Sequence, residues 1–235
     1  MNDNYTKWLE GEKSWIGEVE KKMKKEAWMY SPLVVAACAV ILGAIGLLAG
    51  GGISGMLQNV VYGVIFGVIC IPLIHLAMLT SYPAKRYMKC LKAEIEDVLS
   101  PAERETFARQ MLGMEGEVKV IPWTAGGKLE GIREGKVRLT TDYAVLTTSV
   151  GVAVMVQLSR VKYIDVDVRE YTVTTRSSGF KVQQSSKVYP IYFYYQPHVE
   201  GQKQKCDKEF SFEIRQTREE LSHYLHERQI GGYGV

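Results

Sequence analysis

The chain has 235 residues and a net charge of +3, which is too small to indicate a nucleic-acid partner. Its four cysteines form no CxxC pair, so neither a zinc site nor a disulfide framework is expected. Long uncharged runs fill part of the first half, whereas the second half has the composition of a soluble domain. The length therefore allows one ordinary domain in addition to a membrane segment.

Residues 1–29 are predicted to form an amphipathic N-terminal helix. Apolar side chains recur at helical spacing between lysines and glutamates: Trp8, Leu9, Trp15, Ile16, Val19 and Met23. Such a helix can lie in the membrane interface, or it can pack on the C-terminal domain or on a second copy of the chain. The pattern does not decide between these alternatives.

Residues 30–82 are predicted to form a transmembrane helical hairpin. No charged residue occurs from Leu33 through Tyr82, and spans of about 20 apolar residues fit at 30–49 and 58–80. The glycine-rich segment 48–57 would turn the chain between them. A signal peptide fits poorly, because a charged segment precedes the first run and a second run follows it.

Basic residues flank the two runs. Lys21, Lys22, Lys24 and Lys25 precede the first run, and Lys85, Arg86, Lys89 and Lys92 follow the second. By the positive-inside rule, we expect a multi-pass protein of the cell membrane with both termini in the cytoplasm. Trp28, Tyr30 and Tyr82 stand where an aromatic belt would meet the lipid headgroups.

Small residues predict how the spans pack. Gly63 and Gly67 form a GxxxG pattern in the second run, and Ala39 and Gly43 have the same spacing in the first. These four residues can serve a homodimer or a hairpin within one chain, and the hairpin is favoured. His75 is the one titratable group that such spans would contain besides cysteine and tyrosine, and no acidic partner for it exists in either run.

Residues 83–113 are predicted to form juxtamembrane helices. The first continues from the second span to about Leu99, and the second runs from Pro101 to Leu112. Ser100 with Glu103 has the spacing of a capping box, Pro101 suits the first helical position, and Gly113 would end the helix.

Residues 114–235 change to a period of two and predict an antiparallel β sandwich or barrel. Seven or eight short strands are expected, near 118–123, 137–141, 144–148, 152–158, 161–168, 171–175, 188–195 and 210–214. A final helix would begin at Thr217 as its cap. The predicted fold class is therefore an α+β membrane protein.

The strand segments 137–148 and 156–166 carry a weak family resemblance. They read Val-Arg-Leu-Thr-Thr-Asp-Tyr-Ala-Val-Leu-Thr-Thr and Val-Gln-Leu-Ser-Arg-Val-Lys-Tyr-Ile-Asp-Val. Over about 115–228 the chain resembles the bacterial pleckstrin-homology-like (PH-like) domain membrane proteins. Arg138 and Tyr143 depart from that pattern. The resemblance implies a PH-like cytoplasmic sandwich or barrel closed by a C-terminal helix, which acts in interaction or assembly without catalysis.

The strand at 188–195 is rich in tyrosine, and Tyr189, Tyr192, Tyr194 and Tyr195 are candidates for an interaction surface. Arg169, Arg176, Lys181 and Lys187 are expected in loops, either solvated or touching anionic headgroups. Asp165 and Asp167 would share a strand face, which indicates solvent exposure more than a metal site. His198 is expected in a turn. No phosphate-binding or catalytic motif appears, so no cofactor and no catalytic residue is predicted.

The predicted function is a protein-interaction or assembly module at the membrane, in a chain that is not an enzyme. Its expected partners are the lipid bilayer and either a second copy or another membrane protein, with no nucleic acid. Two alternatives remain open: an accessory subunit of a transporter, and a membrane-bound enzyme with an unrecognised site.

Overall fold

The computed structural model describes residues 3–81, 84–124, 134–149, 151–177, 180–197, 199 and 204–233. Tyr82 and His198 therefore lie outside the described residues. Two compact units divide the chain. One unit joins the residues up to Ser14 with those from Lys85 onward, and the other is Trp15–Ala84. The predicted N-terminal domain 1–29 is thus shared between the units.

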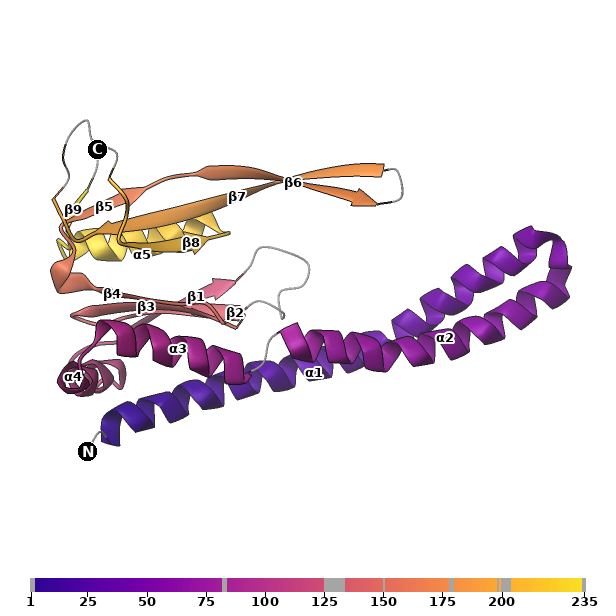
Figure 1. Cartoon of the computed structure of the whole chain (residues 1–235), viewed down its shortest axis with the longest axis horizontal. Coiled ribbons are helices and arrows are strands. Elements are labelled where there is room, and N and C mark those ends of the chain that lie inside the picture. The colour runs from indigo at the N-terminus through magenta and orange to yellow at the C-terminus, as the bar shows by residue number, and fades with distance from the viewer. Residues whose placement is uncertain are drawn as a thin grey trace. The chain divides into compact units, whose positions relative to one another are not determined.

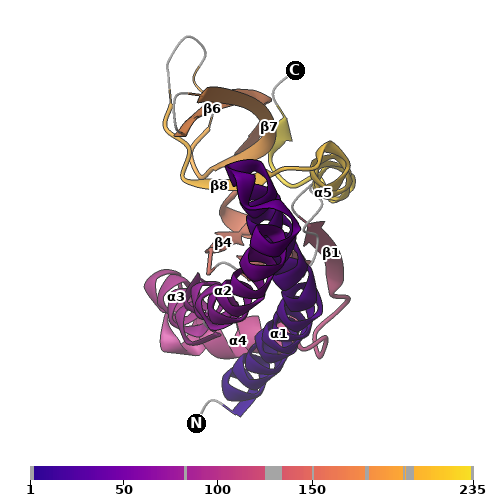
Figure 2. The same ribbon diagram turned by 90° about the vertical axis from the view of Figure 1, so that its right-hand side faces the viewer.

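Two helices form most of the Trp15–Ala84 unit. Helix α1 spans Asp3–Gly46, a π-turn (η1) covers Leu47–Gly51, and α2 spans Gly52–Ser81. The helical path breaks at Gly50 and Gly52, whose φ angles are +82° and +56°. Positive φ is the region that glycine enters without steric cost. The chain then reverses, and α2 returns beside α1 (Figures 1 and 2).

Within the described residues, one continuous helical stretch, Asn4–Leu73, is long and apolar enough to cross a membrane. This stretch contains η1 and the reversal at Gly50, and it includes the whole of the first predicted span, 30–49, and residues 58–73 of the second. It is compatible with a membrane location. The separate amphipathic helix predicted before the first run is absent as a separate element, because α1 continues through Tyr30 without a break.

Two short helices follow, α3 (Ala84–Val98) and α4 (Pro101–Met111). The Ser100 hydroxyl accepts from the Glu103 N–H at 3.4 Å, and the Glu103 carboxylate accepts from the Ser100 N–H at 2.8 Å. This reciprocal pair is the predicted capping box. Gly113 follows α4 with φ +73°, as expected for a residue that ends a helix. Both helices end within one residue of the predicted positions, and the predicted continuation of α2 into α3 depends on residues 82 and 83, which lie outside the described residues.

In the described part of the chain, nine strands form two sheets. The four-stranded sheet has the order β1-β2-β3-β4, and the five-stranded sheet has the order β6-β7-β5-β9 with β8 on β7. The first contains β1 (Lys119–Thr124), β2 (Glu134–Leu139), β3 (Tyr143–Thr148) and β4 (Ala153–Gln157). The second contains β5 (Tyr163–Val166), β6 (Arg169–Ser177), β7 (Phe180–Tyr194), β8 (Lys208–Phe212) and β9 (Gly232–Tyr233). A 3₁₀ turn, η2 (Leu158–Arg160), joins β4 to β5.

The four-stranded sheet is the middle layer of its unit (Figure 1). Every residue of β3 is buried, although successive side chains of a strand point to opposite faces. Ala144 and Leu146 face the second sheet in a core shared with α5, while Tyr143 faces Phe107 of α4 at 5.1 Å. Helices on one side and a sheet on the other therefore explain a strand that is buried on both faces.

Helix α5 (Arg215–Glu227) closes the same core with Leu221 and Leu225. The predicted cap is wrong. The residue before the helix is Ile214, which provides no side-chain hydrogen bond, and Thr217 lies inside the first turn, buried. The apolar spacing located the inward face correctly, because that spacing follows core packing rather than the capping residue.

Strands β5, β6 and β7 form one long hairpin. A single antiparallel register runs from Tyr163 opposite Tyr194 to Ser177 opposite Phe180. The ladder is interrupted where Asp167 meets Pro190, since proline has no N–H to donate. Arg169, Arg176, Lys181 and Lys187 therefore lie on strands, not in the loops predicted for them.

Candidate functional site

The outer face of the second sheet is the first candidate surface. Ile164, Ile191, Phe193 and Phe210 are fully buried, so their neighbours along each strand point away from the core. This outer face carries Tyr163, Asp165, Asp167, Arg169, Tyr171, Tyr192, Tyr194 and Glu209. It combines aromatic rings with charges of both signs.

The four tyrosines singled out from the sequence divide between the two faces of the sheet. Tyr192 and Tyr194 belong to the outer face, whereas Tyr189 and Tyr195 pack against the core. Tyr192 is only 6% exposed, and the guanidinium of Arg169 lies 5.0 Å from its ring centre. Burial raises the pKa of Tyr192 from 10 to about 12. No one face presents all four rings.

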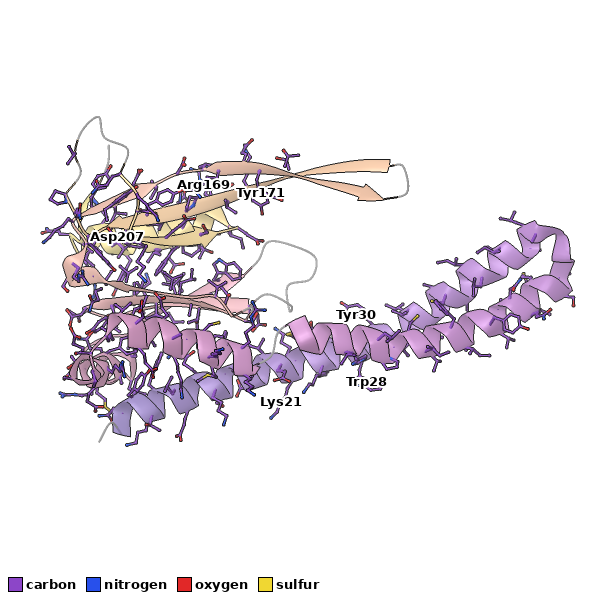
Figure 3. All side chains as sticks on the ribbon, in the orientation of Figure 1. Lys21, Trp28, Tyr30, Arg169, Tyr171 and Asp207 are labelled. Carbon is purple, nitrogen blue, oxygen red and sulfur yellow. The ribbon has the colours of Figure 1, made fainter. Side chains whose placement is uncertain are left out.

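Arg169 connects the buried ring to the exposed part of the outer face. Its guanidinium lies 3.6 Å from the Glu209 carboxylate, on the neighbouring outer position of β8. Tyr171, two residues along β6, is 45% exposed. Figure 3 labels Arg169 and Tyr171 on the long hairpin. The exposed ring of Tyr171 therefore lies near the Arg169–Glu209 ion pair, and a bound partner could contact both.

Asp165 and Asp167 share the outer face, as their spacing predicted. Each carboxylate accepts a hydrogen bond from the next backbone N–H, at 2.9 Å from Val166 and 2.7 Å from Val168. These local bonds use carboxylate oxygens that a metal ion would require. Among the described residues, no group of three or more histidine, cysteine, aspartate or glutamate side chains could hold a metal.

The distal half of the hairpin, residues 169–188, is a two-stranded ribbon. Strand β8 pairs with β7 only from Tyr189 to Phe193, and β5 rather than β6 pairs with β9. In the part of the chain that the structure describes, both ribbon edges thus have no strand partner. An unpaired edge presents backbone N–H and C=O groups to any extended chain that approaches it.

A buried ion cluster was missed by the sequence analysis. The Glu12 carboxylate is 1% exposed and accepts from Lys136 at 3.0 Å and from Arg138 at 2.7 Å. The Tyr87 hydroxyl donates to Glu12 Oε2 at 2.6 Å, the same oxygen that Lys136 contacts, whereas Arg138 contacts Oε1. Burial raises the pKa of Tyr87 and lowers the pKa of Lys136 to about 8. The cluster holds two cations and one anion.

The ion cluster joins three segments that lie far apart in the sequence: the first turns of α1, the first turn of α3, and β2. Close to it, Trp8 packs edge-on against Phe107 at 5.0 Å. Residues 3–14 therefore pack on the C-terminal domain, one of the predicted alternatives. Glu12 and Tyr87 stand within three residues of the two places where the chain passes between its compact units.

The four small residues of the predicted helix contact meet within the chain. A Cβ atom on Gly63 would lie 2.6 Å from the Ala39 Cα, and one on Gly67 would lie 2.8 Å from the Val35 Cα. A Cβ on Gly43 would lie 2.7 Å from Val60 Cγ2. Backbones can approach this closely only at glycine. The GxxxG pattern therefore serves the contact between α1 and α2.

Comparison with protein-family models, with curated proteins and with solved structures gives no match to this chain.

Proposed function

We propose that the chain is an integral membrane protein that crosses the bilayer twice, with both termini in the cytoplasm. Large apolar side chains of α1, η1 and α2 are exposed, including Val40 at 70%, Leu48 at 85% and Ile53 at 73% exposure. In water, a surface of this kind would drive aggregation. In a bilayer, lipid tails cover it, and a helix pair satisfies its backbone hydrogen bonds internally.

The reversal at Gly50 supports two crossings rather than one. The 44 residues of α1 and the 30 residues of α2 each exceed the length that crosses the hydrocarbon core. Lysines cluster before the first run and after the second, and the turn between them is uncharged. This asymmetry favours a cytoplasmic position for both ends.

We further propose that the β-rich unit is a protein-interaction or assembly module at the membrane. The observation that carries this proposal is the ribbon 169–188 with its two unpaired edges. A two-stranded ribbon alone is marginally stable, and a third strand supplies the missing hydrogen bonds. The proposed partner is a protein that adds an extended segment to this ribbon and contacts Tyr171.

The resemblance to bacterial PH-like membrane proteins fits this proposal. Two sheets share one core with a C-terminal helix, and every strand pair that the structure describes is antiparallel except β5 with β9, so the arrangement is close to the one that the resemblance implies. The sheets are separate rather than closed into a barrel. The family would make the module an adaptor and would assign it no reaction.

The test places a photoreactive benzoylphenylalanine at Tyr171 in the full chain, expressed in its native membrane. A matched control places the same group at His223, an exposed position on α5. We expect one discrete adduct from position 171 and no such adduct from position 223. Equal adduct patterns at both positions, or none at either, would contradict the proposal.

A second variant tests the ribbon directly. Residues 172–185 are replaced by Asn-Gly, which keeps Tyr171 opposite Ser186 and closes the hairpin with a tight turn. The core of the domain is untouched, so near-ultraviolet circular dichroism should match the parent chain. We expect the adduct at position 171 to disappear. An adduct of unchanged size and yield would show that the ribbon is not the docking element.

A further inference from the structure

An apolar groove opens between α1 and α2 at the end where Trp28 faces His75. Its volume is about 600 Å³, and it is lined by Trp28, Val68, Ile71, Pro72, His75 and Leu76. A second hollow of about 470 Å³ shares Trp28 and Ile71 with it and continues along α1 past Val35 to Ala39. Together they form a groove on the surface of the helix pair, lined almost entirely by apolar side chains.

The groove has a cause in the sequence. At Gly63 and Gly67 the two backbones are in contact, because no side chain separates them. Farther along, proline rings at Pro32 and Pro72 interrupt the helix ladders, and larger side chains replace glycine. The groove therefore begins beside the glycine contact, at Val35 and Ala39, and extends to the end of the pair that carries Trp28 and His75.

Among the described residues that line these two hollows, the polar side chains Ser31 and His75 lie together. The Ser31 hydroxyl donates to the Ala27 carbonyl at 2.9 Å, and its oxygen lies 3.3 Å from His75 Nε2. The Trp28 ring lies 4.8 Å from the imidazole. An indole and an imidazole thus mark the boundary between the groove and the headgroup level.

Lysines continue the same face of α1 beyond Trp28. Lys21, Lys24 and Lys25 precede Trp28 by seven, four and three residues, which is the spacing of one helix face. All three are exposed, and Lys24 pairs with Glu20 at 2.9 Å. Figure 3 shows Lys21 and Trp28 on the same side of α1, opposite Tyr30. An apolar groove therefore ends at a stripe of positive charge.

We propose that this groove binds one phospholipid with an anionic headgroup. An acyl chain lies along the groove, the ester region meets Trp28 and His75, and the lysine stripe attracts the phosphate. The proposal rests on the proposed membrane placement of α1 and α2. Charge selects the occupant, because a zwitterionic lipid would fill the groove equally well but gain less from the lysines.

The experiment counts lipids that stay bound to the full chain in native mass spectrometry. The protein is purified in detergent with equal amounts of palmitoyl-oleoyl phosphatidylglycerol and phosphatidylcholine. We expect one retained phosphatidylglycerol. Lys21→Gln with Lys25→Gln should weaken it about thirtyfold, because each lysine near an anionic surface contributes about 1 kcal/mol. Trp28→Leu should lower the retention of both lipids.

The control removes the same charge elsewhere. Lys85→Gln with Lys89→Gln lies on α3, outside the groove, and should leave retention unchanged. The lysine variants alter only exposed side chains, so they test the proposal even if Trp28→Leu fails to fold. Equal retention of the two lipids, or full retention after Lys21→Gln with Lys25→Gln, would overturn it.

Carbonate washing of native membranes tests the membrane placement of α1 and α2 separately from the lipid site. A chain that carbonate releases is not integral, and then the proposed membrane placement fails. A chain that stays embedded but retains both lipids equally leaves the placement intact and overturns the lipid site alone.

Discussion

Glu12 holds together three segments that no local pattern connects. It occupies the polar side of an amphipathic stripe, where a glutamate is normally solvated. Its cationic partners are 124 and 126 residues away, and Tyr87 is 75 residues away. Periodicity predicted the helix and its apolar face correctly. It could not predict a buried carboxylate, because burial of a charge depends on partners that only the folded chain supplies.

Replacing Glu12 by Gln should destabilise the β-rich unit by about 3–5 kcal/mol, because Lys136 and Arg138 then lose their buried counter-charge. Denaturant unfolding of the full chain, followed by near-ultraviolet circular dichroism, measures the change. The matched control is Glu20→Gln, which removes an exposed pair with Lys24. It should cost less than about 1 kcal/mol. Equal effects of the two substitutions would refute the role of Glu12.

The surplus cation in this cluster predicts a pH dependence. The folded-state pKa of Lys136 is about 8, against 10.5 for an ordinary lysine, chiefly because burial disfavours the ammonium. Between these values the unfolded chain binds a proton that the folded chain does not. Stability should therefore rise with pH across this window, by at most about 1.4 kcal/mol per pH unit.

The measurement compares the native chain with Lys136→Met, whose side chain has no proton to lose. Unfolding free energies are determined at pH 7 and pH 9.5. The unfolding free energy of the native chain minus that of Lys136→Met should be larger at pH 9.5 than at pH 7. A constant difference would mean that Lys136 stays charged in the folded state.

At the scale of single elements, the sequence predicted the features that depend on neighbouring residues and missed those that depend on distant ones. The capping box at Ser100 and the glycine after α4 were located correctly, since each depends on residues within one turn. The long hairpin was not foreseen. Its polar ribbon has little apolar alternation, so Arg176 and Lys181 were expected in loops. The pairing of the two strands begins in the buried half of the hairpin, where Val166 lies opposite Ile191. The same register then continues through the polar ribbon.

Gly63→Ala tests the close approach of α1 and α2. The added methyl would lie 2.6 Å from both the Ala39 Cα and the Cys38 carbonyl oxygen, so the backbones must separate. We expect a loss of about 1–3 kcal/mol. Titration with sodium dodecyl sulfate, followed by loss of the helical circular dichroism signal, measures it in detergent.

Gly17→Ala on α1 provides the matched control, because a methyl there meets nothing within 4 Å. This substitution should stabilise the helix by about 0.5–1 kcal/mol, since alanine loses less backbone entropy than glycine. Opposite signs for the two substitutions are expected. A stabilising Gly63→Ala would place the GxxxG residues outside the contact.

At the scale of the whole molecule, the stacking of helices and sheets decides which strand faces are buried, and the apolar periodicity of the sequence does not. Alternation indicated strands but not that β1–β4 would be covered on both faces, because a fully buried strand such as β3 resembles any apolar run. The tyrosines of β7 show the same limit. Their spacing placed them on a strand, yet which rings face solvent depends on Arg169, on β8 and on the core beneath them.

The proposed topology puts residues 50–54 on the far side of the membrane and the segments before the first span and after the second in the cytoplasm. Ser54→Cys adds an exposed thiol beside the turn. A membrane-impermeant maleimide should label this variant in intact cells. The native chain is its own control: Cys90 and Cys206 would be cytoplasmic and Cys38 and Cys70 would lie within the spans, so labelling should require lysis. Labelling of Ser54→Cys only after lysis would exclude the second crossing, because a turn that never reaches the outside cannot join two spans.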